Sequence, residues 1–479
     1  MRPVKPRTTS LHSHAERGRA RLFGTSGIRG LVDKSLTPEF AARIGLSFAT
    51  LLNSSGTVLV GRDVRLHSQL IQNAVTSGLL AGGIDVVDCG LVPTSAALFA
   101  MKKLQFSAAI MVTGSHTPAE TGGILFFMSD TGEMDRSGEG CLERIYRSSG
   151  WRRLPWNQLG SFSTINILET YFEETGKLLQ QVSGFRVVVD PGNGSACSTI
   201  GRILEGIGCE VITINGDPDG TFPSRSPCPQ PSTLGSLSAA VRDNKADLGI
   251  GTDGDGDRAL FATDSGEILW GDVTAALFAK NELKRHGGGR IVTTVNTSNL
   301  MRLLCQKYGG DLTVTRVGPP AIAEALREHQ DVIFAAEESG KYIWPDVLLY
   351  GDAALAAGRL LRIMDTEHRS LESLKSELPE MCQFKCTVPC SDELKHQALE
   401  YALTMKEDRG DVQISTLDGL KVSFEDGSCF LVRPSGTEPV LRCYAESPNH
   451  ERGRELLEKA RELAQHAIAK AREVQRDDV

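Results

Sequence analysis

Short apolar runs that end in glycine or polar residues alternate with helix-like stretches through most of this chain. Strand, helix and strand in series favour parallel α/β units, whose strands are buried on both faces. Ligands bind beyond the carboxyl ends of such strands, so we expect the chemistry in the loops that follow them. The predicted strands are 57–61, 84–90, 107–114, 185–194, 209–216, 247–254, 290–295 and 331–340, with helices such as 68–83 and 232–244 between them.

The length of 479 residues requires several domains. We predict an α/β protein in which three similar domains with mixed or parallel sheets and a smaller C-terminal α+β domain surround a central cleft. The last domain is expected because the pattern changes there to antiparallel strands followed by an amphipathic helix from His450. The predicted bounds are 21–165, 166–270 and 271–384 for the α/β domains and 385–479 for the C-terminal domain.

Residues 1–20 are basic and lack the apolar segment of a secretory signal, so we expect a disordered tail, with a transit peptide as the alternative. The net charge of −8 gives no reason to expect nucleic acid as a partner. No apolar run reaches the roughly 18 residues that span a bilayer. Eleven scattered cysteines indicate free thiols in a reducing compartment. We therefore expect a cytoplasmic monomer or homodimer.

The most specific local pattern is GTDGDGDRA at 251–259, directly after a predicted strand. Asp253, Asp255 and Asp257 alternate with glycine, and in an extended segment this spacing places the three carboxylates on one side. Three carboxylates so close together repel one another unless a cation neutralises them. We therefore expect a hard divalent ion, Mg²⁺ above all. A solvated acidic turn is the plainer alternative.

A second pattern, LVRPSGTEPVLR at 431–442, predicts a phosphate-binding loop. Arg433, Ser435, Gly436 and Thr437 combine a guanidinium, two hydroxyls and backbone N–H groups, all of which suit phosphate oxygens. An ordinary hairpin turn is the alternative. Because this loop and the acidic segment lie in different predicted domains, a ligand common to both would bind in a cleft between domains.

A third segment, AAEESGKYIWP at 335–345, ends a predicted strand with polar side chains. Glu337 and Ser339 offer a carboxylate and a hydroxyl, which suit the hydroxyls of a polyol. Lys341 follows them two residues later. The segment is equally typical of an ordinary polar loop.

Two shorter segments lie in the first predicted domain. LFGTSGIRG at 22–30 places Arg29 in a glycine-rich stretch. MVTGSHTP at 111–118 puts Ser115 beside His116 where a buried strand ends. By itself this octet fits a turn serine better than a nucleophile with a partner.

Taken in order, these segments resemble the α-D-phosphohexomutase superfamily, which includes phosphoglucomutases, phosphomannomutases and phosphoglucosamine mutases. FGTSGIRG resembles its N-terminal motif, and GRDVRLHS at 61–68 resembles its GRDxRxS segment. TGSHTP is similar to the active-serine loop and EESGK to the sugar-recognition loop. TDGDGDR and RPSGTEP match the metal-binding and phosphate-binding loops in full. The resemblance covers nearly the whole chain from Leu22 onward.

The resemblance implies an isomerase that carries a phosphoryl group on Ser115. The phosphoserine would give this group to a hexose phosphate and form a bisphosphorylated sugar. That sugar would turn over and return its other phosphate, so that phosphate moves between the 1- and 6-positions. Mg²⁺ bound by Ser115 and the three aspartates would assist, and a hexose 1,6-bisphosphate would act as activator.

The resemblance also implies roles for the other motif residues. Arg29 and Arg258 would neutralise the reacting phosphate, and Glu337 and Ser339 would hold sugar hydroxyls. The phosphate that does not react would lie in the loop formed by Arg433, Ser435, Gly436 and Thr437.

The serine loop departs from the family pattern NPxxxNGxK. Thr117 and Gly122 replace its two asparagines, and Leu125 stands where relatives have a lysine that assists proton transfer. His116 and Lys341 are therefore the candidate bases. We predict phosphomannomutase/phosphoglucomutase activity, with phosphoglucosamine mutase activity as the alternative. A sugar-phosphate phosphatase and a non-catalytic sugar-phosphate-binding homologue are the competing hypotheses.

Overall fold

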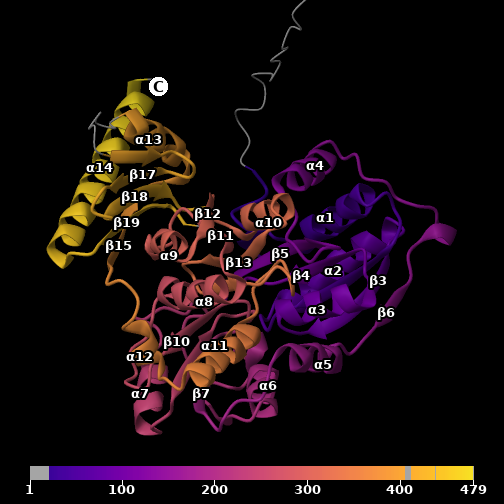
Figure 1. Ribbon diagram of the computed structural model, residues 1–479. Coiled ribbons are helices and arrows are strands. Elements are labelled where there is room, and N and C mark those ends of the chain that lie inside the picture. Colours follow the sequence, from indigo (N-terminus) through magenta and orange to yellow (C-terminus); the bar gives the residue numbers. More distant parts are fainter. Residues whose placement is uncertain (1–20, 405–411, 437, 478–479) are drawn as a thin grey trace, which may run out of the picture.

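The computed structural model describes residues 21–404, 412–436 and 438–477. The predicted tail at 1–20 lies outside these residues. The described chain forms three mixed sheets with flanking helices and one antiparallel sheet, which confirms the predicted fold class. Figure 1 shows the first domain in indigo and purple on the opposite side of the molecule from the yellow C-terminal domain, with the third domain between them.

The first domain is built on a six-stranded sheet in the order β1-β5-β4-β2-β3-β6. The pairs β2–β3, β2–β4 and β3–β6 are parallel, whereas β4–β5 and β1–β5 are antiparallel. The strands are β1 (Ile28–Leu31), β2 (Thr57–Arg62), β3 (Asp85–Leu91), β4 (Ala108–Val112), β5 (Thr121–Met128) and β6 (Phe162–Thr164). The helices are α1 (Pro38–Leu51), α2 (Ser68–Ala81), α3 (Thr94–Leu104), α4 (Arg136–Arg147) and the 3₁₀ turn η2 (Trp156–Gln158).

The second and third domains each have four strands, ordered β10-β9-β7-β8 and β12-β11-β13-β14. In both sheets an antiparallel strand, β10 or β14, lies at one edge of a parallel set. The second domain contains α5 (Leu168–Leu178), β7 (Arg186–Asp190), η3 (Ser195–Ser198), α6 (Ile200–Gly206), β8 (Glu210–Thr213), α7 (Gly235–Asp243), β9 (Leu248–Thr252) and β10 (Ala259–Ala262). The third contains α8 (Gly271–His286), β11 (Gly289–Thr294), α9 (Leu300–Tyr308), β12 (Gly310–Thr315), α10 (Pro319–Glu328), β13 (Val332–Glu337), β14 (Lys341–Ile343), α11 (Ala353–Glu367) and α12 (Leu371–Lys375).

The C-terminal domain has a five-stranded antiparallel sheet in the order β15-β19-β18-β17-β16. Its last helix packs on this sheet through the predicted apolar stripe, of which Leu456, Ala460 and Ile468 are buried. The elements are β15 (Cys382–Pro389), α13 (Asp392–Thr404), β16 (Val412–Ser415), β17 (Leu420–Phe424), β18 (Cys429–Pro434), β19 (Val440–Ser447) and α14 (His450–Asp477).

One continuous hydrophobic cluster joins the first three domains. It includes Met111 of β4, Ile250 of β9 and Phe334 of β13, all fully buried. Because interiors pack as densely as organic crystals, a shared core fixes the three sheets relative to one another. The C-terminal domain has a separate cluster built around α14. Its placement against the third domain therefore depends on contacts at their interface.

Within the described residues, no helix is both long enough and apolar enough to cross a bilayer.

Candidate active site

The three α/β domains each present a loop at the same topological position, where a parallel strand turns into its antiparallel neighbour. The serine loop (113–120) joins β4 to β5, and the acid turn (253–258) joins β9 to β10. The sugar loop (337–341) joins β13 to β14. All three follow the carboxyl ends of parallel strands, where α/β sheets bind their ligands.

Ser115 joins the first domain to the second. Its Oγ donates a hydrogen bond of 2.8 Å to Asp253 Oδ2. The residue is 2% exposed, and its φ of +49° lies in the left-handed region, which is uncommon for residues other than glycine. Strained backbone of this kind persists only where the surroundings hold it in place. The serine is therefore held in one position against the acid turn.

Asp63 and Arg65 provide that support from the GRDVR segment. Asp63 Oδ2 accepts from Thr113 Oγ1 at 2.8 Å and from the Gly114 N–H at 3.0 Å. Arg65 donates to the Ser115 carbonyl at 3.0 Å. Burial opposes the charge of Asp63, but Arg65 and the Ser68 hydroxyl hold the pKa of that carboxyl below its usual range. The sequence showed only that this segment resembles a family motif and gave it no role. The structure shows that it supports the serine loop.

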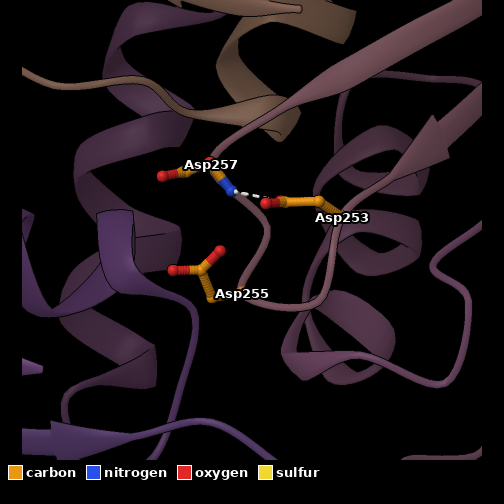
Figure 2. Close-up of side chains that lie close together, drawn as sticks. All are labelled: Asp253, Asp255 and Asp257. Carbon is orange, nitrogen blue, oxygen red and sulfur yellow. Dashed lines mark hydrogen bonds between the residues drawn. The ribbon is translucent and has the colours of Figure 1, made fainter. Parts of the chain in front are cut away.

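The acid turn brings three aspartates together by a route that differs from the predicted one (Figure 2). The expectation of an extended segment was wrong, because the chain folds back between β9 and β10. Asp253 Oδ1 accepts the backbone N–H groups of Gly256, Asp257 and Arg258, at 3.1, 3.2 and 3.3 Å. The turn thus closes over the Asp253 carboxylate, and glycine at 256 permits a φ of +75°.

The donor set of the acid turn fits a divalent metal ion. One carboxylate oxygen from each of Asp253, Asp255 and Asp257 lies within 4.8 Å of the others, and all three residues are buried. Asp255 Oδ2 accepts from Thr94 at 2.8 Å, while its Oδ1 has no hydrogen-bond partner in the described chain. Burial raises the pKa of Asp253 and of Asp255, and the charge of Asp257 raises both further. Three such acids favour a hard cation with oxygen ligands.

Two cations, Arg258 and Lys341, lie next to the acid turn. Arg258 Nε lies 3.6 Å from Asp257 Oδ1 and 3.9 Å from Asp253 Oδ2. Lys341 Nζ lies 2.8 Å from Asp257 Oδ2 and 3.7 Å from the centroid of the Tyr350 ring. Burial opposes ionisation of Asp257, but Lys341 and Arg258 bring the pKa of that carboxyl below its usual value. The site therefore combines concentrated negative charge with fixed positive charge beside it.

His116 and Arg29 lie next to the serine. His116 Nδ1 is 3.4 Å from Ser115 Oγ, and Arg29 donates to the Thr113 carbonyl at 2.9 Å. Burial and the charges of Arg258 and Arg29 hold the pKa of His116 well below its ordinary value, so the imidazole is neutral at physiological pH. Leu125, at the position of the family lysine, is fully buried in the shared core and supplies no charge.

A cleft of about 670 Å³ opens above these groups and is lined by Arg29, His116, Arg258 and Ser339 together with Gly436 and Arg442. A recess of about 110 Å³ adjoins it. Glu337, Arg433 and Ser435 line the recess, so the structure brings the predicted sugar and phosphate residues to one place. Lys341 lies beneath the cleft at 1% exposure, and Thr437 is outside the described residues.

The phosphate loop, of which 433–436 and 438–439 are described, is held against the first domain. Gly436 approaches Thr25 so closely that a Cβ there would lie 1.9 Å from the Thr25 hydroxyl. Arg433 donates to Asp418 at 3.0 Å while its Nε has no partner in the described chain. Arg442, which the motif reasoning missed, lies at the mouth of the recess with its Nε 3.4 Å from Ser435 Oγ.

Comparison with family models matches all four domains in order. The descriptions are phosphoglucomutase/phosphomannomutase α/β/α domains I, II and III, over residues 20–153, 169–266 and 270–382, and the C-terminal domain over 386–463. The chain belongs to the phosphoglucomutase/phosphomannomutase family. Members of this family are mutases, so the protein is an isomerase of the phosphohexomutase class.

Relatives of this family member span nearly its whole length. A phosphoglucomutase/phosphomannomutase of Thermococcus kodakarensis is 36% identical, and a probable phosphoglucosamine mutase of Pyrococcus abyssi is 38% identical; each match covers 94% of this chain and 99% of the relative. The crystal structure of a family protein from Burkholderia thailandensis has a TM-score of 0.83 at 26% identity, covering 93% of this chain and 97% of that one. The relatives differ in the sugar that their names specify, so the family relationship leaves the substrate open.

Proposed function

We propose that this phosphohexomutase uses Mg²⁺ and a phosphoserine at Ser115 to interconvert hexose 1-phosphates and 6-phosphates, with phosphomannomutase/phosphoglucomutase activity. The hydrogen bond from Ser115 Oγ to Asp253 Oδ2 is the observation that supports this most directly. A protein that only binds sugar phosphates has no use for a serine held against a cluster of buried acids. Phosphoryl transfer, by contrast, requires positioning and charge neutralisation above all.

In the proposed reaction Ser115 Oγ passes its phosphoryl group to a hydroxyl of the bound hexose phosphate. Arg29 and Arg258 neutralise charge on the group in transit from fixed positions, which need no reorganisation during the reaction. Ser115 and the three aspartates would hold Mg²⁺, which would supply a further positive charge to the phosphoryl group. The buried walls of the site exclude water, whose attack on the phosphoserine would produce free phosphate.

The recess accommodates the opposite end of the sugar phosphate. Glu337 and Ser339 hold sugar hydroxyls, while Arg433, Ser435 and Gly436 hold the phosphate that does not react. Thr437 belongs to the same loop. A bisphosphorylated sugar that turns over in this space presents its second phosphate to the serine, and the same compound, a hexose 1,6-bisphosphate, is the proposed activator.

Arg433→Lys tests the second phosphate subsite. Lysine keeps the charge but loses the forked donor geometry that matches phosphate oxygens. We expect the KM for glucose 1-phosphate to rise about tenfold with a smaller change in kcat. Arg290→Lys is the matched control, because Arg290 pairs with Asp331 on the third-domain sheet, away from the cleft. An unchanged KM in Arg433→Lys would remove the loop from the proposal.

Magnesium binding should stabilise the fold in a pH-dependent way. The pKa values of Asp253 and Asp255 are raised, so in the metal-free protein these groups stabilise the fold while protonated and lose that contribution as the pH rises through their folded-state values. Mg²⁺ offsets this loss by neutralising the ionised acids. We expect Mg²⁺ to raise Tm more at about pH 8 than at about pH 5.5. Asp255→Asn should reduce the difference between the two Tm increases. Equal increases in Tm at both pH values would contradict a metal at the acid turn.

The decisive assay supplies glucose, mannose or glucosamine 1-phosphate with Mg²⁺ and a trace of the matching 1,6-bisphosphate. Formation of the 6-phosphate from glucose and mannose is the expected result. Preferred conversion of the glucosamine compound would establish the alternative activity. Conversion of none of them would refute the mutase proposal for these sugars, and release of free phosphate would favour a phosphatase.

A further inference from the structure

Glu338 is the second acid of the sugar loop and lines both the cleft and the recess. Its Oε1 accepts a hydrogen bond of 3.1 Å from Asn296 Nδ2, and its Oε2 accepts from Lys385 Nζ. The Glu338 side chain is 15% exposed. The carboxylate is thus partly open to the sugar subsite and bound from behind by an ammonium group.

Lys385 comes from the C-terminal domain. It lies on β15, and its Nζ is 4.0 Å from the centroid of the Trp270 ring, which lines the cleft, and 5.7 Å from that of Tyr444. Burial opposes the charge of this lysine, but Glu338 and Asp272 raise its pKa above the ordinary value. The ammonium therefore stays charged, and its contacts with the Trp270 and Tyr444 rings add to its ion pair with Glu338.

These contacts determine the electrostatic environment of a sugar bound beside Glu338. An unpaired carboxylate in an enclosed site would attract an ammonium group on the ligand strongly. Here the carboxylate already has a cation in Lys385, and Arg442, which lines the same cleft, is paired with Glu438. A second ammonium group brought by the sugar would therefore find the Glu338 carboxylate already paired and would lose its hydration without an ion pair in return.

We propose that Lys385 is a specificity-determining positioning residue that neutralises Glu338 and so makes the sugar subsite select uncharged hexose phosphates over hexosamine phosphates. The proposal rests on the mutase function above and extends it to the class of sugar. It assigns this selectivity to a residue of the C-terminal domain rather than to the sugar loop alone. An ion pair that served only to attach the domain would affect all sugars alike, and this difference makes the two roles separable.

The test compares kcat/KM for glucose 1-phosphate and glucosamine 1-phosphate at neutral pH, where most of the amine is protonated. Lys385→Met should shift the glucosamine-to-glucose ratio toward glucosamine by at least about tenfold. Glu338→Gln should shift it the opposite way by a similar factor, because Lys385 is then unpaired. The double variant should return to within about threefold of the original ratio, since neither charge remains.

Two controls separate charge from packing. Lys421→Met removes another lysine of the C-terminal domain, one that donates to the Val295 carbonyl at 2.8 Å rather than to Glu338, and it should leave the ratio unchanged. N-acetylglucosamine 1-phosphate carries the nitrogen without the charge, so its ratio to glucose should not follow that of glucosamine. An unchanged ratio in Lys385→Met, or parallel shifts for the two nitrogen-bearing sugars, would overturn the proposal.

Failure of this inference is distinguishable from failure of the mutase proposal. If the unmodified protein turns over none of the three sugar phosphates, the mutase proposal fails. The selectivity is then measured as the ratio of calorimetric Kd values for glucose 6-phosphate and glucosamine 6-phosphate in the same variants. The same shifts are expected there, and absence of any difference between variants refutes the role of Lys385. The double variant, which removes both members of the Glu338–Lys385 ion pair, serves if Lys385→Met does not fold.

Discussion

The substitution Ser115→Ala is expected to lower kcat for glucose 1-phosphate conversion by at least about 10⁴-fold, as loss of a nucleophile does in other enzymes. The reason is chemical, because Ser115 Oγ, which lies 2.8 Å from Asp253 Oδ2, is the proposed phosphoryl carrier. The hydroxyl of Thr94 also reaches the acid turn, 2.8 Å from Asp255 Oδ2, but Thr94 is fully buried at the start of α3. The measurement is a coupled assay of 6-phosphate formation with Mg²⁺ and the 1,6-bisphosphate. Intact mass spectrometry should find one phosphoryl group on the unmodified protein after incubation with the bisphosphate and none on Ser115→Ala.

The fold of Ser115→Ala should survive, since a single hydrogen bond contributes about 1 kcal/mol to stability. Ser47→Ala is a matched control: Ser47 is also a fully buried serine of the first domain, and its Oγ donates to the Arg43 carbonyl within α1. Its activity should equal that of the unmodified protein. If Ser115→Ala kept a tenth of the activity or more, the phosphoryl carrier would have to be sought elsewhere.

The substitution Lys341→Met is expected to lower kcat for glucose 1-phosphate conversion by about 10²- to 10⁴-fold. Two properties of Lys341 underlie this prediction: it is a candidate for proton transfer, and its Nζ, 2.8 Å from Asp257, balances a buried carboxylate. Removing the lysine leaves that carboxylate only its longer contact with Arg258 Nε at 3.6 Å, and loss of a partner from a buried pair destabilises proteins by up to about 3–5 kcal/mol. Steady-state kinetics and urea denaturation measure the two effects separately.

Lys341→Arg distinguishes a proton carrier from a fixed charge. Arginine keeps the charge but does not give up its proton at any working pH. We expect Lys341→Arg to lose nearly as much activity as Lys341→Met while keeping most of the stability. His116→Gln should lose less than about tenfold, because an imidazole whose pKa is held low is a weak base. A larger loss in His116→Gln than in Lys341→Arg would reverse the assignment of the base.

Much of the fold was predictable because its signals are local. Each predicted strand of the α/β domains has a counterpart in the structure. A short run of apolar β-branched residues, such as the three valines of β7, is enough to predict a buried strand. Six strands of the α/β domains were missed, namely β1, β5, β6, β12 and the antiparallel edge strands β10 and β14, which have only four and three residues. These two edge strands matter for the site, because pairing with them turns the acid and sugar loops into tight bends.

The site was predictable in part. Its residue types followed from motifs whose chemistry lies within a few positions, such as the three aspartates of the acid turn. The support of Ser115 by Asp63 and Arg65 was not predictable, nor was the contact of Lys341 with Asp257, because each joins segments that are far apart along the chain. No local pattern specifies which cation reaches which acid.

By itself the sequence determined the family, the fold class, the order of the motif loops and the kinds of group they carry, because these depend on local apolar patterning and on short segments. Only the tertiary structure decided how the loops meet. The shared core of the first three domains sets Ser115 against an aspartate 138 positions away, and the interface with the C-terminal domain sets Lys385 against Glu338. The physical reason is that such contacts depend on how whole sheets pack, and close packing fixes long-range distances that no short segment encodes.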